Sequence, residues 1–520
     1  MTGTARTAEV AGVTLAFVGA VAMGLYAVRP FVVGPIGPDA AAPVIEFQRL
    51  LAGQQLEGYL SQTSKPLLTV LYGLARIGSG DWRSVSLLAI VSFGAFVAAA
   101  SLLAYRIAGL LAAAFAGVAL ALSPELLRDV TFAYGVSWAM LAGAVAGLAV
   151  VRPQPRYGMA GIALAAGALA RPEVLAVTGF GLAAVVIAAI GGAAGRWKAR
   201  APRTWLIGLG LLAIPILSVH DFLLTGDPLR WANIAQENSA GGVTRGLLGM
   251  LGFVARYVLH LAPLLPLAGI ALISLAMRRR WTEAIVVAIV PIAVATFFIA
   301  SGSRGTVISN RYLMPINLGI VFAAAVGLGA FDVPVVRRVF RPLSGRGGWG
   351  IAGAVVALGA SVAVALAPSW PFAPGIRASV AAQRTREGNA ERAFAALSTS
   401  IGSVPAWRGV APPADPETVV YIPAALRAQG IVDLDLPLWA GTKLFASMVD
   451  PANGLPAPGS ILYHDSWADR PAPVWRQVEL TEPAIAGRLL LTPILADGRA
   501  GIWIVRVEAA PGTDPPAPQP

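Results

Sequence analysis

The chain has 520 residues, of which 56% are hydrophobic and only 13% are charged. Soluble globular proteins have roughly 25% charged residues, so this composition disfavours that class. The absence of cysteine excludes a disulfide framework, a Cys-ligated zinc site and a thiol nucleophile. The 39 Lys and Arg residues exceed the 27 Asp and Glu residues, which gives a net charge of +12. Whether that charge indicates a nucleic-acid partner depends on where it lies along the chain.

Apolar stretches long enough to cross a bilayer recur through the first 368 residues. In chain order they are residues 10–28, 84–104, 107–124, 134–151, 205–224, 249–275, 283–301, 313–331 and 350–367. A further apolar tract, residues 157–196, is too long for one helix and is interrupted by Arg171-Pro172-Glu173. We expect two short spans that meet in a turn there, because proline cannot continue a straight helix. The chain is therefore predicted to be an α-helical polytopic membrane protein with about eleven spans.

The basic residues test this count through the positive-inside rule. Eleven crossings place every basic loop on one side: Arg6, Arg106, Arg152/Arg156, Arg196/Lys198/Arg200/Arg203, Arg278/Arg279/Arg280 and Arg337/Arg338/Arg341/Arg346. These fifteen basic residues share their side with only three acidic ones, Glu9, Glu283 and Asp332. The net charge is thus an orientation signal and gives no support for a nucleic-acid partner. We predict a bacterial cytoplasmic (inner) membrane protein with its N-terminus inside and its C-terminus outside.

Three regions follow from this topology. Residues 1–368 form the membrane domain, with a first span taken as an uncleaved signal anchor (a signal peptide is the alternative) and a long first outer loop, residues 29–83. That loop contains two amphipathic segments, residues 44–53 and the segment after Ser64-Lys65-Pro66, both suited to lie at the interface. Residues 369–510 are predicted to be a small extracytoplasmic α/β domain, with a helix near 389–397 and strands near 418–422, 460–464 and 501–507. A disordered tail, residues 511–520, is expected after it.

Asp39 lies just beyond the outer end of the first span, ahead of the first amphipathic segment. The simple interpretation is a helix N-cap, for which Asp is favoured. The alternative is a general base held at the membrane surface, and the two roles are compatible.

The order of short motifs along the whole chain resembles the GT-C glycosyltransferases, which include protein O-mannosyltransferases, aminoarabinose transferases and arabinosyltransferases. A short first span is followed by an outward acid, two interfacial helices and a Lys-Pro-Leu-Leu segment. Further matches are Leu169-Ala170-Arg171-Pro172-Glu173, Thr225-Gly226-Asp227-Pro228-Leu229 and Asn310-Arg311-Tyr312-Leu313-Met314-Pro315. Many relatives have an Asp-Glu pair where this chain has Asp39-Ala40, so one carboxylate stands at the matching position.

The resemblance implies a polyprenyl-phosphate-linked sugar as donor, with an inverting transfer to a glycan, lipid or protein acceptor hydroxyl on the extracytoplasmic face. Asp39 matches the family's base. A departing lipid phosphate would need preorganised partners to stabilise its charge. The candidates for donor-phosphate or substrate binding on the outer side are Lys65, Arg171, Arg304, Arg311 and Tyr312.

Each of these residues also has a structural interpretation. Arg171 could pair locally with Glu173 or mark a turn, and Arg311 with Tyr312 could anchor a helix start at the interface. Arg304 and Lys65 could be solvated loop charges.

A possible second carboxylate lies in the short outer loop, at Asp129 or Glu125. It would bind the acceptor or a divalent metal, although Ser123-Pro124-Glu125 is also an ordinary helix start. His220-Asp221 could bind metal or substrate, but adjacent residues on a helix point in different directions. Whether a metal is needed stays open.

Two other classes of function fit the same composition. The chain could be a transporter or flippase of polyprenyl-linked saccharides, or a polysaccharide polymerase or assembly protein without the Asp39 chemistry. A transport pathway usually places ionisable residues inside the spans, whereas most of those here fall in the outer loops. The glycosyltransferase interpretation is therefore preferred.

Overall fold

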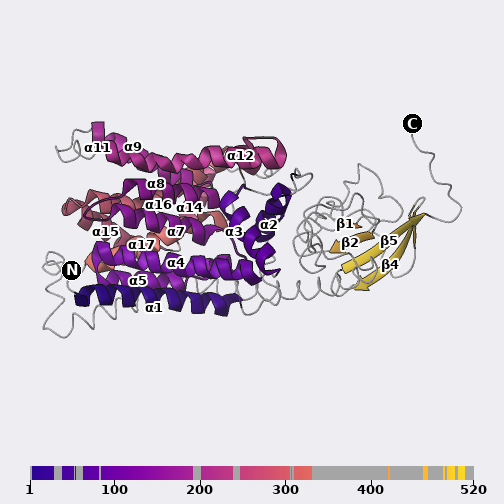
Figure 1. The fold of residues 1–520 in the computed structure, drawn as a ribbon, viewed down its shortest axis with the longest axis horizontal. Coiled ribbons are helices and arrows are strands. Elements are labelled where there is room, and N and C mark those ends of the chain that lie inside the picture. Colours follow the sequence, from indigo (N-terminus) through magenta and orange to yellow (C-terminus); the bar gives the residue numbers. More distant parts are fainter. Residues whose placement is uncertain are drawn as a thin grey trace.

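The computed structural model describes two parts of the chain (Figure 1). The first is a helical bundle within residues 3–330, and the second is a set of strands within residues 420–509. The described residues are 3–28, 38–51, 53, 63–80, 83–190, 201–237, 246–259, 261–304, 306, 310–330, 420–421, 461–465, 484–486, 489–497 and 502–509. The predicted span 350–367, the helix near 389–397 and the tail 511–520 lie outside them.

The bundle is built from apolar helices, most of which run back and forth along one axis (Figure 1). They are α1 (Gly3–Val28), α4 (Arg83–Ala108), α5 (Leu110–Ala121), α7 (Val136–Val150), α8 (Tyr157–Ala170), α9 (Val174–Ile190), η1 with α12 (Trp205–Leu212 and Ala213–Thr225), α14 (Gly246–Leu259), η2 with α15 (Ala262–Leu264 and Leu265–Met277), α16 (Trp281–Ser303) and α17 (Met314–Ala330). Shorter helices are α2 (Pro38–Leu51), α3 (Pro66–Ser79), α6 (Pro124–Thr131), α11 (Ala201–Thr204), α13 (Arg230–Glu237) and η3 (Asn310–Leu313).

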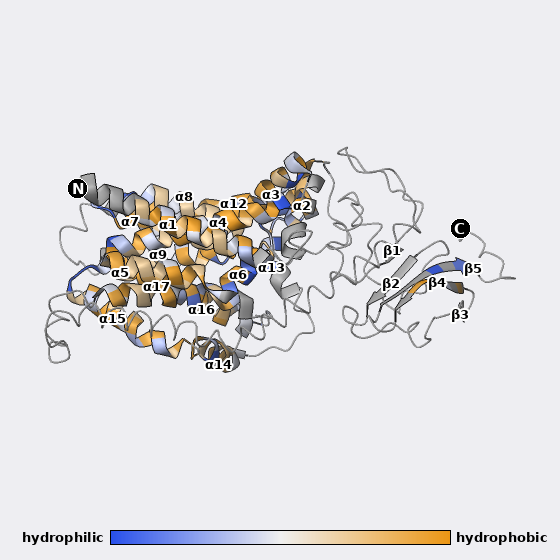
Figure 2. Cartoon of the chain, turned by 90° about the horizontal axis from the view of Figure 1, so that it is seen from below, coloured by the Kyte–Doolittle hydropathy of each residue, from blue (hydrophilic) through white to orange (hydrophobic). Residues whose placement is uncertain are grey.

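The apolar composition of these helices matches a bilayer. Within the described residues, three helices are long and apolar enough to span it alone: Arg83–Ala108, Trp205–Thr225 and Trp281–Ser303. Two bent pairs bring the number to five, and five shorter apolar helices accompany them. Hydrophobic colour covers the helices along their length in Figure 2, and many large apolar side chains are exposed, such as Leu110, Ile187 and Leu248. Water would disfavour such a surface, whereas hydrocarbon would not.

The tract after Tyr157 divides as predicted. α8 ends at Ala170 and α9 begins at Val174, with Arg171-Pro172-Glu173 between them. The backbone of Arg171 is extended, with φ −153° and ψ 112°. Proline disfavours the helical conformation in the residue before it, which explains why α8 ends there.

Two predicted spans are not single straight helices. The stretch 249–275 is two helices, α14 and η2–α15, bent by 73°. The stretch 107–124 contains α5 and reaches Pro124, where α6 begins at 53° to α5. Pro263 and Pro266 lie at the first break and Pro124 begins α6, so proline accounts for both bends. Hydropathy alone does not detect such breaks, because the apolar run continues through them.

The helices pack closely through small residues. The largest group of buried apolar residues joins α5, α7, α8 and α17 and contains many alanines. A side chain at Gly327 would collide with the backbone of Leu267, and one at Gly329 with the backbone of Ala108. Small residues therefore allow helices to approach one another, as is common in membrane bundles.

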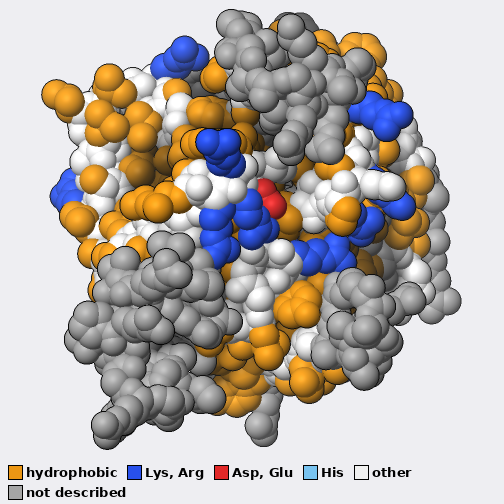
Figure 3. Space-filling model, turned by 90° about the vertical axis from the view of Figure 1, so that its left-hand side faces the viewer, with side chains coloured by type: hydrophobic (Ala, Val, Ile, Leu, Met, Phe, Trp, Pro, Cys, Tyr) orange, Lys and Arg blue, Asp and Glu red, His pale blue; other side chains and the backbone are white. Residues whose placement is uncertain are grey.

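The two ends of the bundle differ in charge. Arginines gather on the end that faces the viewer in Figure 3, with little acidic colour among them. Loops and helix ends at this basic end contain Arg106, Arg152, Arg156, Arg203 and Arg278–Arg280. The described basic loops thus lie together, as the alternation of spans predicts. α2, α3, α6 and α13 lie at the opposite end (Figures 1 and 2).

The strands form one five-stranded sheet in the order β1-β2-β5-β4-β3. Its members are β1 (Val420–Tyr421), β2 (Ile461–Asp465), β3 (Ala484–Ala486), β4 (Leu489–Asp497) and β5 (Ile502–Ala509). β1 pairs with β2 in parallel, and the other pairs are antiparallel. Three strands coincide with the predicted β runs, while β3 and β4 were missed.

Candidate functional site

Ionisable side chains are buried together at the end of the bundle opposite the basic one. We call this region the polar end, formed by α2, α3, α6, the connection Arg171–Glu173, the C-terminal part of α12 and η3. Its buried charged residues are Glu46, Lys65, Asp129, Arg171, Glu173, His220 and Asp221. Burying a charge without a partner is expensive, so such a cluster requires specific pairing.

Arg171 is the centre of the first group of contacts. Its Nε donates to Oε1 of Glu173, and its guanidinium lies 5.8 Å from the centre of the Tyr312 ring. Burial lowers the pKa of Arg171, but the carboxylates of Glu173 and Asp129 outweigh this effect and raise it overall. The guanidinium therefore stays charged. The predicted local pair with Glu173 exists, and the same arginine also meets Tyr312 from the distant motif before α17.

Because Gly135 has no side chain, the turn at Arg171 can lie buried against the start of α7. A Cβ at Gly135 would lie 2.8 Å from Cδ1 of Leu68, 3.1 Å from the carbonyl oxygen of Ala170 and 3.5 Å from Cγ of Arg171. Glycine thus lets the start of α7 approach both α3 and the end of α8.

α3 presents one polar face to the bundle. Lys65 precedes Pro66 at the start of α3 and is buried, as are Thr69 and Tyr72 one and two turns further on. The Tyr72 hydroxyl donates to the carbonyl oxygen of Ala133 at 3.1 Å. Lys65 is therefore not a solvated loop charge but part of the polar end.

A second group of contacts joins α2, α3 and α12. The Thr69 hydroxyl donates to Oε2 of Glu46 at 2.9 Å, and Nε2 of His220 lies 3.9 Å from the same oxygen. Nδ1 of His220 lies 3.0 Å from Oδ1 of Asp221, which also accepts from the hydroxyl of Ser64. α2 is thereby fixed to the bundle through Glu46.

Sequence reasoning missed Glu46. The signal was present, because this acidic residue lies one turn after the buried Ala42, on the same side of α2. An acidic residue on the apolar side of an interfacial helix needs a partner. The partner could not be inferred, since His220 is far away in the sequence.

Glu125 is the centre of a third group of contacts. Both of its carboxylate oxygens lie 3.0 Å from the hydroxyl of Tyr257, and Nδ2 of Asn317 donates to Oε2 at 3.1 Å. Ser123 caps α6, accepting from the backbone N–H of Leu126, so the predicted helix start is also correct. Glu125 and Asp129 are four residues apart and lie on one side of α6, which connects this group with Arg171.

The remaining predicted residues lie around the polar end. α2 begins at Pro38, which places Asp39 in its first turn, where the helix dipole favours a carboxylate. Arg311 lies in η3 beside Tyr312, while Arg304 follows α16 and is exposed. The side chains of Asp39 and Arg311 lie outside the described part of the structure.

Metal binding receives no support from the described residues. Among them, no group of three or more His, Cys, Asp and Glu side chains is arranged to hold a metal ion. His220 and Asp221, considered as a metal pair from sequence, meet Glu46 and Ser64 instead.

The chain resembles solved structures in its fold. No family model and no curated protein matches the sequence. The fold matches ArnT from Cupriavidus metallidurans in the apo state with a TM-score of 0.59 and 17% identity, covering 98% of this chain and 100% of that one. For the same ArnT bound to undecaprenyl phosphate, the TM-score is 0.57 and the identity 16%, covering 97% and 99%. The oligosaccharyltransferase AglB from Archaeoglobus fulgidus, solved with an inhibitory peptide and a dolichol-phosphate, gives a TM-score of 0.52 at 14% identity, covering 86% of this chain and 65% of that chain.

These matches extend over nearly the whole chain. The protein therefore shares its fold with ArnT and is a multi-pass helical membrane protein, as its sequence predicts. Identities this low establish a shared fold, while substrate and acceptor must be argued from the site.

Proposed function

We propose that the protein is a glycosyltransferase that moves a sugar from a polyprenyl-phosphate donor to an acceptor hydroxyl on the extracytoplasmic face of a bacterial inner membrane. The observation that most supports it is the buried polar end, where Arg171, Asp129 and Tyr312 meet on the fold of ArnT. ArnT was solved with undecaprenyl phosphate, a lipid of the class that would serve here as the carrier.

The reaction needs a base and a stabilised leaving group. The acceptor oxygen attacks the anomeric carbon and the bond from that carbon to the phosphate oxygen breaks. The acceptor proton passes to the Asp39 carboxylate, and the lipid phosphate leaves with the electron pair. A single displacement of this kind inverts the anomeric centre.

Cations at the polar end supply the stabilisation. Arg171 and Lys65 are buried, so they act in a region of low dielectric constant where a preorganised charge is most effective. Arg311 follows Asn310 in η3, beside Tyr312, and is the third candidate for the phosphate. Exposed Arg304 would attract the anionic headgroup at the membrane surface.

The contacts of α2 support the role of Asp39. Glu46 lies two turns further along α2 and is fixed to α3 and α12 by Thr69 and His220. Asp39 and Glu46 belong to the same helix, with Pro43 between them, so these contacts favour a position of the Asp39 backbone near the polar end. Positioning of this kind is what a general base requires.

The proposal is tested with Asp39→Asn in purified protein. A panel of radiolabelled polyprenyl-phosphate monosaccharides is used, and release of polyprenyl phosphate is measured in the presence of membrane glycans or lipids as acceptors. The variant should lose at least about 100-fold in rate while it still binds undecaprenyl phosphate. Glu283→Gln, an equivalent change at the basic end, should leave the rate near that of the wild type.

Other outcomes would assign another function. A wild-type rate in Asp39→Asn would contradict this residue as base. Absence of transfer by the wild type, together with movement of lipid-linked saccharide across proteoliposomes, would indicate a transporter instead.

A further inference from the structure

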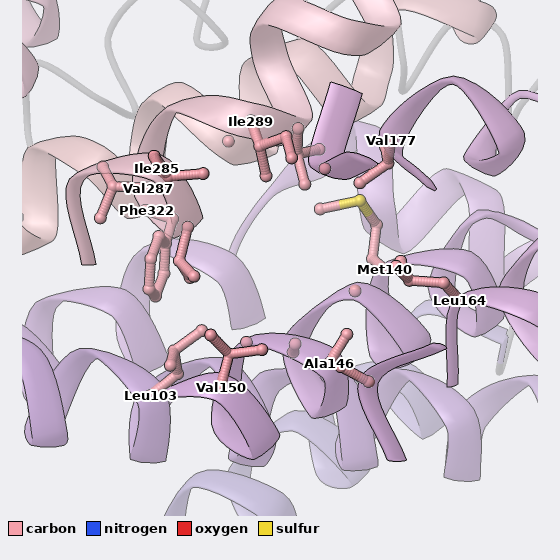
Figure 4. A pocket seen from close by; sticks show the side chains of 18 of the residues that line it. Leu103, Met140, Ala146, Val150, Leu164, Val177, Ile285, Val287, Ile289 and Phe322 are labelled. Atoms are coloured by element: carbon pink, nitrogen blue, oxygen red, sulfur yellow. The ribbon is translucent and has the colours of Figure 1, made fainter. Parts of the chain in front are cut away.

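A cavity of about 150 Å³ lies inside the bundle, away from the contacts of the polar end. It is lined by α16 and α17 on one side and by α4, α7, α8 and α9 on the other (Figure 4). Ile289, Phe322, Val150, Met140 and Val177 point toward the open space in that view. The wall is almost entirely apolar, so water would gain few hydrogen bonds there.

The polar part of the lining lies at one rim. Tyr157, Thr204 and Thr282 are lining residues with hydroxyl groups. Tyr157 begins α8, Thr204 ends α11 and Thr282 lies in the first turn of α16, all at the basic end of the bundle.

Each of these hydroxyl residues is accompanied by an arginine. Arg156 precedes Tyr157, Arg203 precedes Thr204, and Arg280 lies two residues before Thr282. Arg156 and Arg203 are exposed, whereas Arg280 donates to Glu283 and to the carbonyl oxygen of Ile107. The cavity therefore has an apolar interior, and its hydroxyl-bearing side lies at the basic end of the bundle, where arginines stand next to the hydroxyl residues in sequence without lining the cavity themselves.

We propose that this cavity is a binding site for an anionic glycerophospholipid of the cytoplasmic leaflet. The phosphate would lie between Arg156 and Arg203, and part of one acyl chain would enter the cavity. Positive charge at the basic end selects an anionic headgroup, since basic side chains attract acidic lipids at a membrane surface. The volume resembles that of cavities which accept a benzene-sized molecule, so only a segment of one chain fits.

This site does not rest on the proposed glycosyltransferase function. It lies toward the basic end, whereas the donor would bind at the polar end. A lipid there would fill space between α16 and its neighbours α7, α8 and α9, and would act as a structural ligand of the bundle.

Gly143 provides a sharp test of the cavity. It lies on α7 among the lining residues, and a Cβ placed there would meet nothing within 4 Å. Gly143→Leu should therefore place apolar atoms in the cavity, since the first added carbon has room there. Gly179→Leu is the matched control, since Gly179 in α9 also has open space around it but is exposed and does not line the cavity.

The measurement is native mass spectrometry of delipidated protein titrated with phosphatidylglycerol or with phosphatidylcholine of the same acyl chains. Wild type and Gly179→Leu should bind one phosphatidylglycerol molecule on the order of tenfold more tightly than phosphatidylcholine. Gly143→Leu should lose this tight binding.

A second pair of variants tests the rim. Arg156→Gln with Arg203→Gln should abolish the preference for phosphatidylglycerol. Arg278→Gln with Arg279→Gln removes the same charge from the basic end, but neither arginine directly precedes a lining residue as Arg156 and Arg203 do, so this pair should retain the preference. Because these variants leave the interior unchanged, they test the site even if Gly143→Leu fails to fold.

Three results would overturn the proposal. They are unchanged phosphatidylglycerol binding in Gly143→Leu, equal binding of the two phospholipids by the wild type, and co-purification of a polyprenyl phosphate instead of a glycerophospholipid at this site.

Discussion

At the scale of single residues, Arg171 combines two roles that are hard to separate. It neutralises the buried carboxylates Glu173 and Asp129, and its guanidinium lies over Tyr312. Arg171→Lys keeps a positive charge but loses the planar group that donates to Glu173 and stacks on the ring. We expect transfer to fall about 100-fold, measured as kcat/KM with a lipid-linked donor.

A stability control accompanies this variant. Arg171→Leu would leave two carboxylates uncompensated, and loss of one partner of a buried ion pair costs about 3–5 kcal/mol. Its melting temperature in detergent should fall clearly, while that of Arg171→Lys should change little. Equal activity of Arg171→Lys and wild type would contradict a role for this arginine at the phosphate.

Glu125 permits a prediction about stability. Its carboxylate accepts from Tyr257 and Asn317, which come from α14 and α17. Glu125→Leu would leave both donors without this acceptor, at about 1–3 kcal/mol for each. Thermal unfolding in detergent should show the loss, whereas Glu125→Gln, which keeps a carbonyl oxygen, should lose much less. Similar melting temperatures of the two variants would show that the contacts contribute little.

Residue types could be predicted from the sequence, but their partners could not. Arg171 and Tyr312 were both selected, yet only the fold brings positions more than a hundred residues apart into contact. Glu46 was missed because its role follows from its contacts with Thr69 and His220, which belong to other helices. Local patterns identify a buried charge, while the contact that satisfies it is a property of the tertiary structure.

At the scale of elements, the packing of α2 on α3 controls where Asp39 lies. A Cβ at Gly73 of α3 would collide with the ring and Cβ of Phe47 in α2. Gly73→Ala should therefore displace α2, at a cost of about 1–3 kcal/mol, without altering the main bundle. We expect strongly reduced transfer, with faster amide hydrogen exchange confined to α2 and α3. Gly78→Ala, where the added Cβ meets nothing within 4 Å, is the matched control and should behave as wild type.

The helices themselves were largely predictable. Hydropathy located the apolar stretches, and the physical chemistry of proline correctly divided the tract at Arg171-Pro172-Glu173. The bend between α14 and α15 was missed although Pro263 and Pro266 mark it, because the apolar run was read for length only. The strands β3 and β4 were missed for a different reason, since a strand depends on the residues that pair with it as well as on its own sequence.

At the scale of the whole molecule, the two ends of the bundle contain different arrangements of charged residues. The basic end contains arginines with few acidic partners, as expected where loops face the cytoplasm. The polar end contains acids and bases that are buried and paired. We infer that the excess of positive charge orients the chain, whereas buried acids and bases together build the candidate site.

This arrangement makes a prediction about sidedness that the absence of cysteine renders simple to test. Ser79 is exposed at the end of α3, and Gln154 is exposed between α7 and α8. Ser79→Cys should react with a membrane-impermeant maleimide in intact spheroplasts, whereas Gln154→Cys should react only after permeabilisation. The parent chain, which has no thiol, provides the background. The opposite pattern would place the polar end in the cytoplasm, where a base at Asp39 would face a different pool of acceptors.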